Sequence, residues 1–492
     1  MATIRATRTF SDKFKKIKYK KLGVTDLTVS VCGFGSYRID ENVKDHIEAL
    51  KFALNSGINL IDTSSNYTDG GSEKLIGKVL NEEFKNNTIS RDEIIVVSKG
   101  GYLQGENLNN AKKKEEEGNP YKEVVKCSPD LWHCIQPDFL KDQISNSLKR
   151  LKLDKIDVYL LHNPEYFLTY SGIPIEERRI KEYNKRIKIA FEYLETEVEK
   201  GRISYYGISC NTFGEDEDKN NFTSLEKVFE LANLITPENR FAVVQLPMNI
   251  FEKGAFKNLN QNNSAQSFLQ FAFENKFGIL VNRPLNAIKD NKIIRLADFE
   301  IKENRNKKEV NDLIEQVDKK ETEIKMEYVK DVELPDSERK SLNECLSLAE
   351  ILKNNMDKIQ SVNQFSEIKG YYLIPRANYA IQNLIKINKE DEKLVSTLND
   401  YAVNVNVLMD SVESLFAKEQ NDKNKEIHNE LNKYLKKDQT KLSLSQKSIL
   451  MINSLQEVSS TLVGMRKKEY VDDVLGSIAT EYIDNAKDFW RK

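Results

Sequence analysis

Short apolar runs alternate with longer amphipathic stretches through residues 1–289 of the chain. Most of the short runs are continuously apolar, a pattern typical of parallel strands that are buried on both faces. The longer stretches, such as VKDHIEALKFALNSG and PDFLKDQISNSLKRLKL, predict amphipathic helices. The runs that predict strands are LTVSVCGFG (27–35), INLID (58–62), EIIVVSK (93–99), IDVYLLH (156–162), ISYYGIS (203–209), FAVVQL (241–246) and GILVNRP (278–284).

One more strand-like run, SSTLVGM (459–465), follows the helical stretch SLSQKSILMINSLQ near the C-terminus. Together the runs make eight βα units, which predict an α/β fold of the closed (β/α)8 TIM-barrel type. The active site of such a barrel lies at the C-terminal ends of the strands. Polar residues stand at six of these ends, which favours a functional site over unrelated loop residues: Asp62, Lys99, His162, Ser209, Gln245 and Arg283.

Residues 290–440 have a different pattern. They contain a single glycine, Gly370, whereas residues 1–289 contain 17 of the 20 glycines. Apolar residues recur here at spacings of three and four, which predicts an inserted α-helical, coiled-coil-like subdomain between the seventh and eighth strands. A spacer, a lid and a partner-binding arm all remain open as roles. The recurring positions are Val310, Leu313, Val317, Ile324, Leu342, Cys345, Ala349, Leu352, Met356, Ile359, Leu394, Leu398, Val405, Leu408, Val412 and Leu415.

The chain therefore divides into four expected segments. They are a basic N-terminal arm (1–17), the first part of the barrel (18–289), the helical insertion (290–440) and the final βα unit with the C-terminus (441–492). The N-terminal stretch MATIRATRTFSDKFKKIKYKK is basic and rich in hydroxyl groups. We interpret it as a disordered arm of a cytoplasmic protein, with a mitochondrial transit peptide as the alternative.

Composition excludes several classes of function. Lys and Arg (75) nearly balance Asp and Glu (77), and the net charge of −2 gives no signal for nucleic acid or for an anionic membrane. No run reaches the ~18 apolar residues that suggest a membrane span. The 5 cysteines show no metal-ligand spacing, so reduced thiols and no metal site are expected.

Several motifs resemble the aldo-keto reductase family, and they occur in the family's order. They are YKKLGVTDLTVSVCGFGSYRI, IDTSSNYTDGGSEKLIG, IIVVSK, SNSLKRLKLDKIDVYLLH and LVGMRKKEYVDDVL. The resemblance covers residues 18–289 and 441–480 and leaves the helical insertion unexplained. It implies an NADP-dependent oxidoreductase built on a TIM barrel.

The resemblance also implies a catalytic tetrad of Asp62, Tyr67, Lys99 and His162. Hydride transfer to a carbonyl carbon leaves negative charge on the oxygen, which has to be stabilised and protonated. Tyrosine, with a pKa of about 10, is a weak acid at neutral pH, and an adjacent ammonium makes its proton easier to lose. Lys99 would be that cation, Asp62 would hold it, Tyr67 would deliver the proton and His162 would orient the carbonyl.

Cofactor-binding positions carry over from the family less evenly. Asn282 stands where an aromatic ring normally stacks on the nicotinamide, Arg283 replaces a serine, and either Cys210 or Asn211 takes the role of the family's asparagine. The implied cofactor residues are Gly35, Ser36, Tyr37, Asp62, Ser209, Asn211, Gln245, Asn282, Arg283, Pro284, Leu285, Gly464, Arg466, Tyr470 and Asp473.

Arg466 is followed by Lys467 and Lys468 at the expected start of a helix, which favours NADPH over NADH because basic groups there suit a 2′-phosphate. The predicted function is therefore NADPH-dependent reduction of an aldehyde, ketone or sugar carbonyl. A cofactor-binding regulatory or scaffold protein, holding a protein partner on its helical arm, is the alternative. The substrate stays open because it depends on the rim of the barrel, where the loops 102–134 and 163–185 and the helical insertion depart most from the family.

Overall fold

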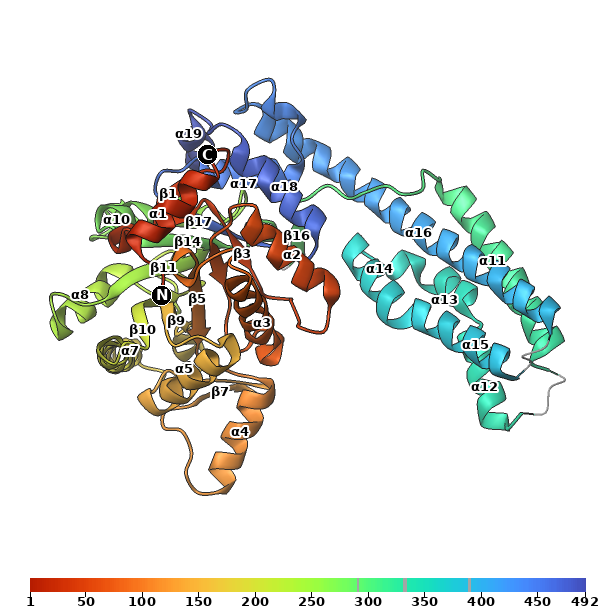
Figure 1. Cartoon of the computed structure of the whole chain (residues 1–492), viewed down its shortest axis with the longest axis horizontal. Helices are drawn as coiled ribbons and strands as arrows, with labels where there is room; N and C mark the ends of the chain where they lie inside the picture. Colours follow the sequence, from red (N-terminus) through yellow and green to blue (C-terminus); the bar gives the residue numbers. More distant parts are fainter. Residues whose placement is uncertain (290–291, 331–333, 388–390) are drawn as a thin grey trace. The chain divides into compact units, whose positions relative to one another are not determined.

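The computed structural model describes residues 1–289, 292–330, 334–387 and 391–492. The chain divides into two compact units (Figure 1). The barrel unit consists of Met1–Leu296 and Leu431–Lys492, and the helical unit consists of Ala297–Glu430. The segment boundary that the sequence analysis set at residue 290 lies outside the described residues.

Eight parallel strands close the barrel, and this confirms the predicted (β/α)8 fold (Figure 1). Each strand pairs with the next one in the sequence of barrel strands, and the last pairs with the first. The strands in this order are β3 (Cys32–Gly35), β4 (Leu60–Asp62), β5 (Ile95–Gly100), β9 (Ile156–His162), β10 (Ile203–Ser209), β11 (Phe241–Pro247), β14 (Gly278–Asn282) and β17 (Ser460–Gly464).

Helices follow the barrel strands and surround them (Figure 1). They include both stretches predicted above, which form α2 and α5. In chain order they are α2 (Lys44–Asn55), α3 (Gly71–Lys85), α5 (Pro137–Leu151), α7 (Glu176–Glu199), α8 (Leu225–Ile235), α10 (Phe268–Glu274), α17 (Leu444–Asn453) and α18 (Lys468–Ala479). Shorter helices of the same unit are α6 (Tyr166–Tyr170), α9 (Gly254–Lys257) and α19 (Ala486–Arg491).

The first predicted strand, 27–35, is in fact two strands. Only its second half is the barrel strand β3, while its first half forms β2 (Thr28–Ser30), which pairs antiparallel with β1 (Tyr19–Lys21). Leu27 and Val29 of this hairpin join the apolar core that the barrel strands share. The continuous apolar pattern therefore has two causes, because one half is buried within the barrel wall and the other half covers its interior.

The N-terminal segment is also different from the expected disordered arm. Residues Ile4–Lys13 form helix α1, and the side chain of Thr3 caps the helix by accepting a hydrogen bond from the Ala6 N–H. Phe10 on this helix is 1% exposed. The basic residues suggested disorder, but Arg5, Arg8 and Lys13 are exposed on a helix whose other face, with Thr7 and Phe10, is buried.

Three smaller elements extend the loops after the barrel strands. The loop after β5 contains a three-stranded sheet made of β6 (Tyr102–Leu103), β7 (Val125–Ser128) and β8 (Leu131–His133). Helix α4 (Gly105–Glu116) connects β6 to β7 in the same loop. Strands β12 (Leu259–Gln261) and β13 (Gln266–Ser267) pair after β11. After β14, the hairpin of β15 (Asn286–Lys289) and β16 (Lys292–Arg295) was not predicted.

The helical unit has its own apolar core, and most of the recurring apolar positions named above are buried in it. Its helices are α11 (Lys307–Tyr328), α12 (Asp336–Cys345), α13 (Leu348–Asn355), α14 (Val362–Ile368), α15 (Ile374–Ile387) and α16 (Glu392–Asn432). Glu321 is buried in this core and accepts hydrogen bonds from the Tyr401 hydroxyl and from the N–H groups of Leu348 and Ala349. A buried carboxylate needs such partners, so these contacts tie α11 to α13 and α16.

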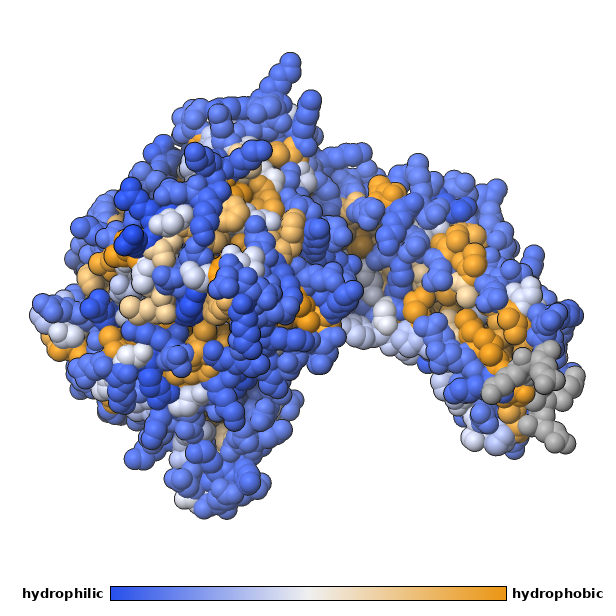
Figure 2. All heavy atoms as spheres, viewed as in Figure 1, coloured by the Kyte–Doolittle hydropathy of each residue, from blue (hydrophilic) through white to orange (hydrophobic). Residues whose placement is uncertain are grey.

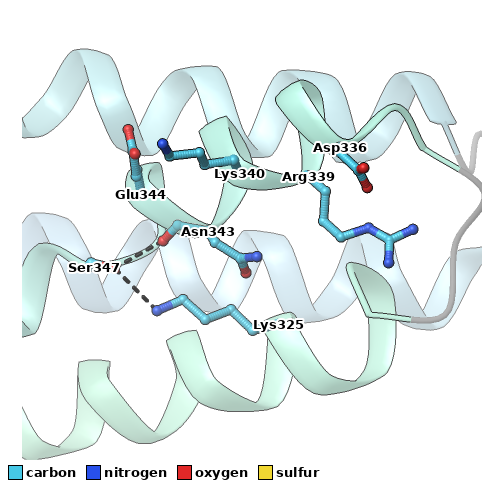
Figure 3. Close-up of a pocket in the computed structure, with 7 residues that line it drawn as sticks. All are labelled: Lys325, Asp336, Arg339, Lys340, Asn343, Glu344 and Ser347. Carbon is cyan, nitrogen blue, oxygen red and sulfur yellow. Dashed lines mark hydrogen bonds between the residues drawn. The ribbon is translucent and has the colours of Figure 1, made fainter.

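Most of the viewed surface of each unit is hydrophilic, with hydrophobic atoms scattered over it (Figure 2). None of the helices formed by the described residues combines the length and apolar character that a membrane crossing requires. The helical unit also has a surface hollow of about 620 Å³ with mixed charges (Figure 3). Its lining residues are Lys325, Asp336, Arg339, Lys340, Asn343, Glu344 and Ser347.

Candidate active site

Strand register brings most of the predicted site residues to one end of the barrel. Gly35 pairs with Asp62 on the neighbouring strand, and Ser209 pairs with both His162 and Gln245. Each of these residues lies at or near the C-terminal end of its strand. This is the end at which (β/α)8 barrels carry their active sites.

Lys99 occupies the centre of this group. Its ammonium donates three hydrogen bonds, to Asp62 Oδ2 at 2.8 Å, to the Thr63 carbonyl at 2.9 Å and to Tyr67 Oη at 3.1 Å. All three N–H groups are therefore used, and the side chain is 0% exposed. Burial by itself would lower the pKa of Lys99, but the Asp62 carboxylate outweighs this effect and the pKa is raised. Lys99 is a charged ammonium at neutral pH.

Tyr67 begins a short 3-10 turn, Tyr67–Gly70, directly after β4. Burial raises the pKa of its phenol, and the Lys99 ammonium acts in the opposite direction. Since Lys99 donates to the phenol oxygen, the Tyr67 proton has to point elsewhere. No acceptor within hydrogen-bond distance is found for it among the described residues, so this proton is available to an oxygen atom of a bound molecule.

His162 ends β9 and is 8% exposed. Burial lowers the pKa of its imidazole well below the usual value, and the positive charge of Lys99 adds to the effect. The ring is therefore neutral at physiological pH and acts through hydrogen bonds, not as a cation. Its ring centroid lies 6.0 Å from that of Tyr67, in an edge-to-face arrangement.

Three side-chain amide and hydroxyl groups form a row beside Asp62. Gln245 Nε2 donates to Asp62 Oδ1 at 2.8 Å, and Gln245 Oε1 accepts from Ser209 Oγ at 2.9 Å and from Asn282 Nδ2 at 3.1 Å. Asn282 Oδ1 is buried and has no hydrogen-bond partner among the described residues. A carboxamide N–H donor would satisfy this oxygen, so the row fits the carboxamide of a nicotinamide ring.

The residues after β3 lie beside the tetrad. Ser36 Oγ donates to the Asp62 carbonyl at 2.7 Å, which fixes the loop after β3 to the end of β4. Tyr37 is 62% exposed, and its ring meets the Tyr67 ring edge-on with centroids 5.1 Å apart. The structure thus leaves one face of Tyr37 open next to the candidate proton donor.

Other predicted cofactor residues have different surroundings. The Arg283 side chain pairs with Glu252 at 2.7 Å, and among the described residues it makes no hydrogen bond to Gln245, Ser209 or Asn282. The backbone N–H of Asn211 donates a hydrogen bond to Glu165 Oε1 at 2.9 Å. The Asn211 side chain is exposed and takes no part in this hydrogen bond. Pro284 and Leu285 are buried.

The C-terminal positions differ among themselves. Gly464 pairs with Gly35, and a Cβ added to it would meet no atom within 4 Å. Arg466 is exposed, and Tyr470 is 40% exposed. Asp473, by contrast, accepts hydrogen bonds from Ser443 and Ser445 at the start of α17, so both of its oxygens are engaged within the protein.

Sequence reasoning missed two arginines near Arg466. These two are Arg295 on β16 and Arg38. Burial lowers the pKa of Arg295, and the positive charges of Arg466 and Arg38 lower it further, whereas Tyr470 raises it. The hairpin β15–β16 and the loop after β3 therefore add positive charge to the same region. Arg295 belongs to none of the quoted motifs, and Arg38 stands near the end of one of them without any sign in the sequence that it lies near Arg466, so only the tertiary structure could bring the three arginines together.

Sequence reasoning also missed groups that surround His162. His133 on β8 hydrogen-bonds through Nε2 to the His162 carbonyl at 2.8 Å, and the Tyr102 ring lies 4.6 Å from the His162 ring. Ser64 Oγ lies 3.0 Å from His162 Nδ1. The Ser64 position was visible in the sequence, because it falls between Asp62 and Tyr67 within the quoted motif.

The family model for the aldo/keto reductase family matches residues 32–366. The chain belongs to this family.

Curated relatives match shorter parts of the chain. The NADH-specific methylglyoxal reductase of Escherichia coli (strain K12) is 29% identical over 29% of this chain and 40% of the relative. The 6-dehydroglucose reductase of Novosphingobium aromaticivorans is 27% identical over 48% of this chain and 62% of the relative. The chain thus spans about half the length of these relatives. Among solved structures, the chain is similar to an aldo-keto reductase from Bacillus halodurans in its holo form. The alignment spans 96% of this chain and 95% of that structure, with 16% sequence identity and a TM-score of 0.46.

Proposed function

We propose that this protein reduces the carbonyl group of an aldehyde, ketone or sugar with NADPH, and that Tyr67 donates the proton. The observation that carries the proposal is the three-donor arrangement of Lys99. It places a buried ammonium 3.1 Å from a phenol whose own proton has no acceptor among the described side chains and backbone groups. Family membership supports the same reaction class.

The nicotinamide, when bound, supplies the hydride. The protein's residues have the remaining tasks. Asp62 holds the Lys99 ammonium at 2.8 Å, and Lys99 stabilises the phenolate that forms as Tyr67 Oη gives up its proton. The neutral His162 binds the carbonyl oxygen by a hydrogen bond and orients it toward Tyr67. Gln245, Ser209 and Asn282 would hold the carboxamide of the cofactor.

NADPH is proposed over NADH because positive charge gathers at Arg466. A 2′-phosphate is a dianion near neutral pH and is bound most strongly by charge-assisted hydrogen bonds. Arg295 and Arg38 add their charge to that of Arg466. The name of the methylglyoxal reductase relative states NADH specificity, so NADH has to be measured as the competing cofactor.

The direct test is cofactor consumption against a panel of carbonyl compounds. Because the names of the two relatives specify methylglyoxal and 6-dehydroglucose, the panel should contain short dicarbonyls and oxidised sugars as well as simple aldehydes. We expect oxidation of NADPH with at least one of them. Binding of NADPH without turnover of any carbonyl would instead favour the regulatory or scaffold alternative, which the relatives described here do not support.

Arg466→Ala is expected to weaken NADPH binding by about 1.5–3 kcal/mol, because a charge-assisted bond to the phosphate is lost. NADH affinity should barely change, since NADH lacks this phosphate. Fluorescence titration of both cofactors measures the difference. The matched control is Arg491→Ala, an exposed arginine near the C-terminus that pairs with Asp488. Equal losses for the two cofactors in the Arg466 variant would contradict the assignment.

The helical unit is proposed to fold semi-independently of the barrel. Among the described residues, its core is formed by side chains of α11–α16 and of the segments that join them, and by none from the barrel unit. We expect that a short Gly/Ser linker in place of residues 297–430 leaves a barrel that is folded and binds NADPH. Circular dichroism and cofactor titration measure this, and turnover of a small aldehyde separates a lid from a partner-binding arm. Insoluble protein after the replacement would show that the barrel depends on this unit.

A further inference from the structure

Ser64 has a position from which it can act on His162. It is fully buried, follows Asp62 by two residues, and holds its Oγ 3.0 Å from His162 Nδ1. A neutral imidazole carries its single proton on either Nδ1 or Nε2, and the hydrogen bond made by one nitrogen decides the state of the other. The contact with Ser64 therefore bears on whether His162 Nε2 is a donor or an acceptor.

The Ser64 hydroxyl continues into a chain of side-chain hydrogen bonds. Its Oγ lies 2.7 Å from Asn66 Oδ1, and Asn66 Nδ2 lies 3.0 Å from Gln104 Oε1. The Lys99 carbonyl is a weaker competitor for the hydroxyl at 3.3 Å. Gln104 is the N-cap residue of α4, so the chain links that helix to the candidate catalytic histidine.

The chain has two self-consistent directions. With the amides as they stand, Ser64 donates to Asn66, so His162 Nδ1–H donates to Ser64 and Nε2 is left without a proton. A half-turn of both amides exchanges oxygen and nitrogen at nearly the same positions. Asn66 then donates to Ser64, Ser64 donates to Nδ1, and Nε2 carries the proton. Only this second direction provides the donor that a carbonyl oxygen requires.

We propose that Ser64 and Asn66 are positioning residues that select the tautomer of His162, and that the active direction of the chain places the proton on Nε2. The proposal rests on the proposed function for its catalytic consequence, but the tautomer itself is independent of turnover. Because His162 is neutral at physiological pH, the selection is between two neutral tautomers and involves no change of charge.

Asn66→Asp tests the direction of the chain. A carboxylate at this position can only accept, so Ser64 has to donate to it, and His162 is forced to carry its proton on Nδ1. In protein with 15N-labelled histidine, NMR distinguishes the two ring nitrogens, and a His162→Asn spectrum assigns the signals among the 4 histidines. We expect the Nε2–H form in the wild type and the Nδ1–H form in Asn66→Asp.

Gln104→Glu provides a second route to the same result. A carboxylate at 104 has to accept from Asn66 Nδ2, which turns Asn66 Oδ1 toward Ser64 and again gives Nδ1–H. In the double variant Ser64→Ala with Asn66→Asp, the connection is cut, so Asp at position 66 should no longer change the tautomer relative to Ser64→Ala alone. Ser64→Thr keeps the hydroxyl and should preserve the wild-type form.

Kinetics provide a separate readout. Asn66→Asp and Gln104→Glu should lower kcat for carbonyl reduction about 10-fold or more, because an oriented donor to the developing oxyanion is lost, while NADPH affinity stays the same. A His162 tautomer that is identical in wild type, Asn66→Asp and Gln104→Glu would overturn the proposal, as would an Asn66→Asp effect that persists without Ser64. A protein that shows the tautomer switch but reduces no carbonyl would overturn the proposed function alone.

Discussion

Tyr67→Phe is expected to lower the rate of carbonyl reduction at least ~10²-fold and to leave NADPH affinity nearly unchanged. The substitution removes only the phenol hydroxyl, which accepts a hydrogen bond from Lys99 and has its own proton available. The ring keeps its packing against Tyr37 and His162, so the shape of the site is retained. Steady-state kinetics and a cofactor titration measure the two expectations separately.

Tyr170→Phe is the matched control for this substitution. Tyr170 lies 47% exposed on the short helix after β9, with its ring 5.6 Å from that of Tyr166, and among the described residues it makes no hydrogen bond or ring contact with a member of the tetrad. Loss of its hydroxyl should leave kcat near the wild-type value. Wild-type turnover in Tyr67→Phe would show that another group donates the proton, and the assignment of Tyr67 would be wrong.

Lys99→Met should abolish detectable reduction and also destabilise the fold. The ammonium is the buried partner of the Asp62 carboxylate, whose side chain is 5% exposed. Removing one member of a buried ion pair leaves the other charge uncompensated, which typically costs about 3–5 kcal/mol of folding stability. Denaturant unfolding measures this loss, and a single-turnover assay measures the chemistry.

The double variant Asp62→Asn with Lys99→Met separates the two effects. It removes both charges, so we expect stability to recover by a large part of the loss in Lys99→Met. Activity should not recover, because no ammonium remains to stabilise the Tyr67 phenolate. Recovery of turnover in the double variant would mean that Lys99 has only a structural role.

The apolar pattern was sufficient to predict the barrel. All eight predicted runs supply a barrel strand, because strands buried on both faces have to be continuously apolar. The pattern could not separate β2 from β3 within residues 27–35, since a hairpin that covers the barrel interior is as apolar as the barrel wall. The pattern also could not predict helix α1, because most of its residues are polar or basic and only Thr7 and Phe10 are buried.

The tetrad was proposed from the family resemblance, and three of its members, Asp62, Lys99 and His162, lie at or near strand ends that meet at one end of the barrel. The sequence determined the spacing of Tyr67 after Asp62, and hence which loop carries the phenol. Only the tertiary structure decided which groups complete the site. The unpredicted hairpin β15–β16 places Arg295 where the charge of Arg466 acts on it. A chain of hydrogen bonds through Asn66 and Ser64 connects Gln104 to His162. Such contacts depend on where separate loops lie in space, and local patterns of apolar and polar residues contain no information about that placement.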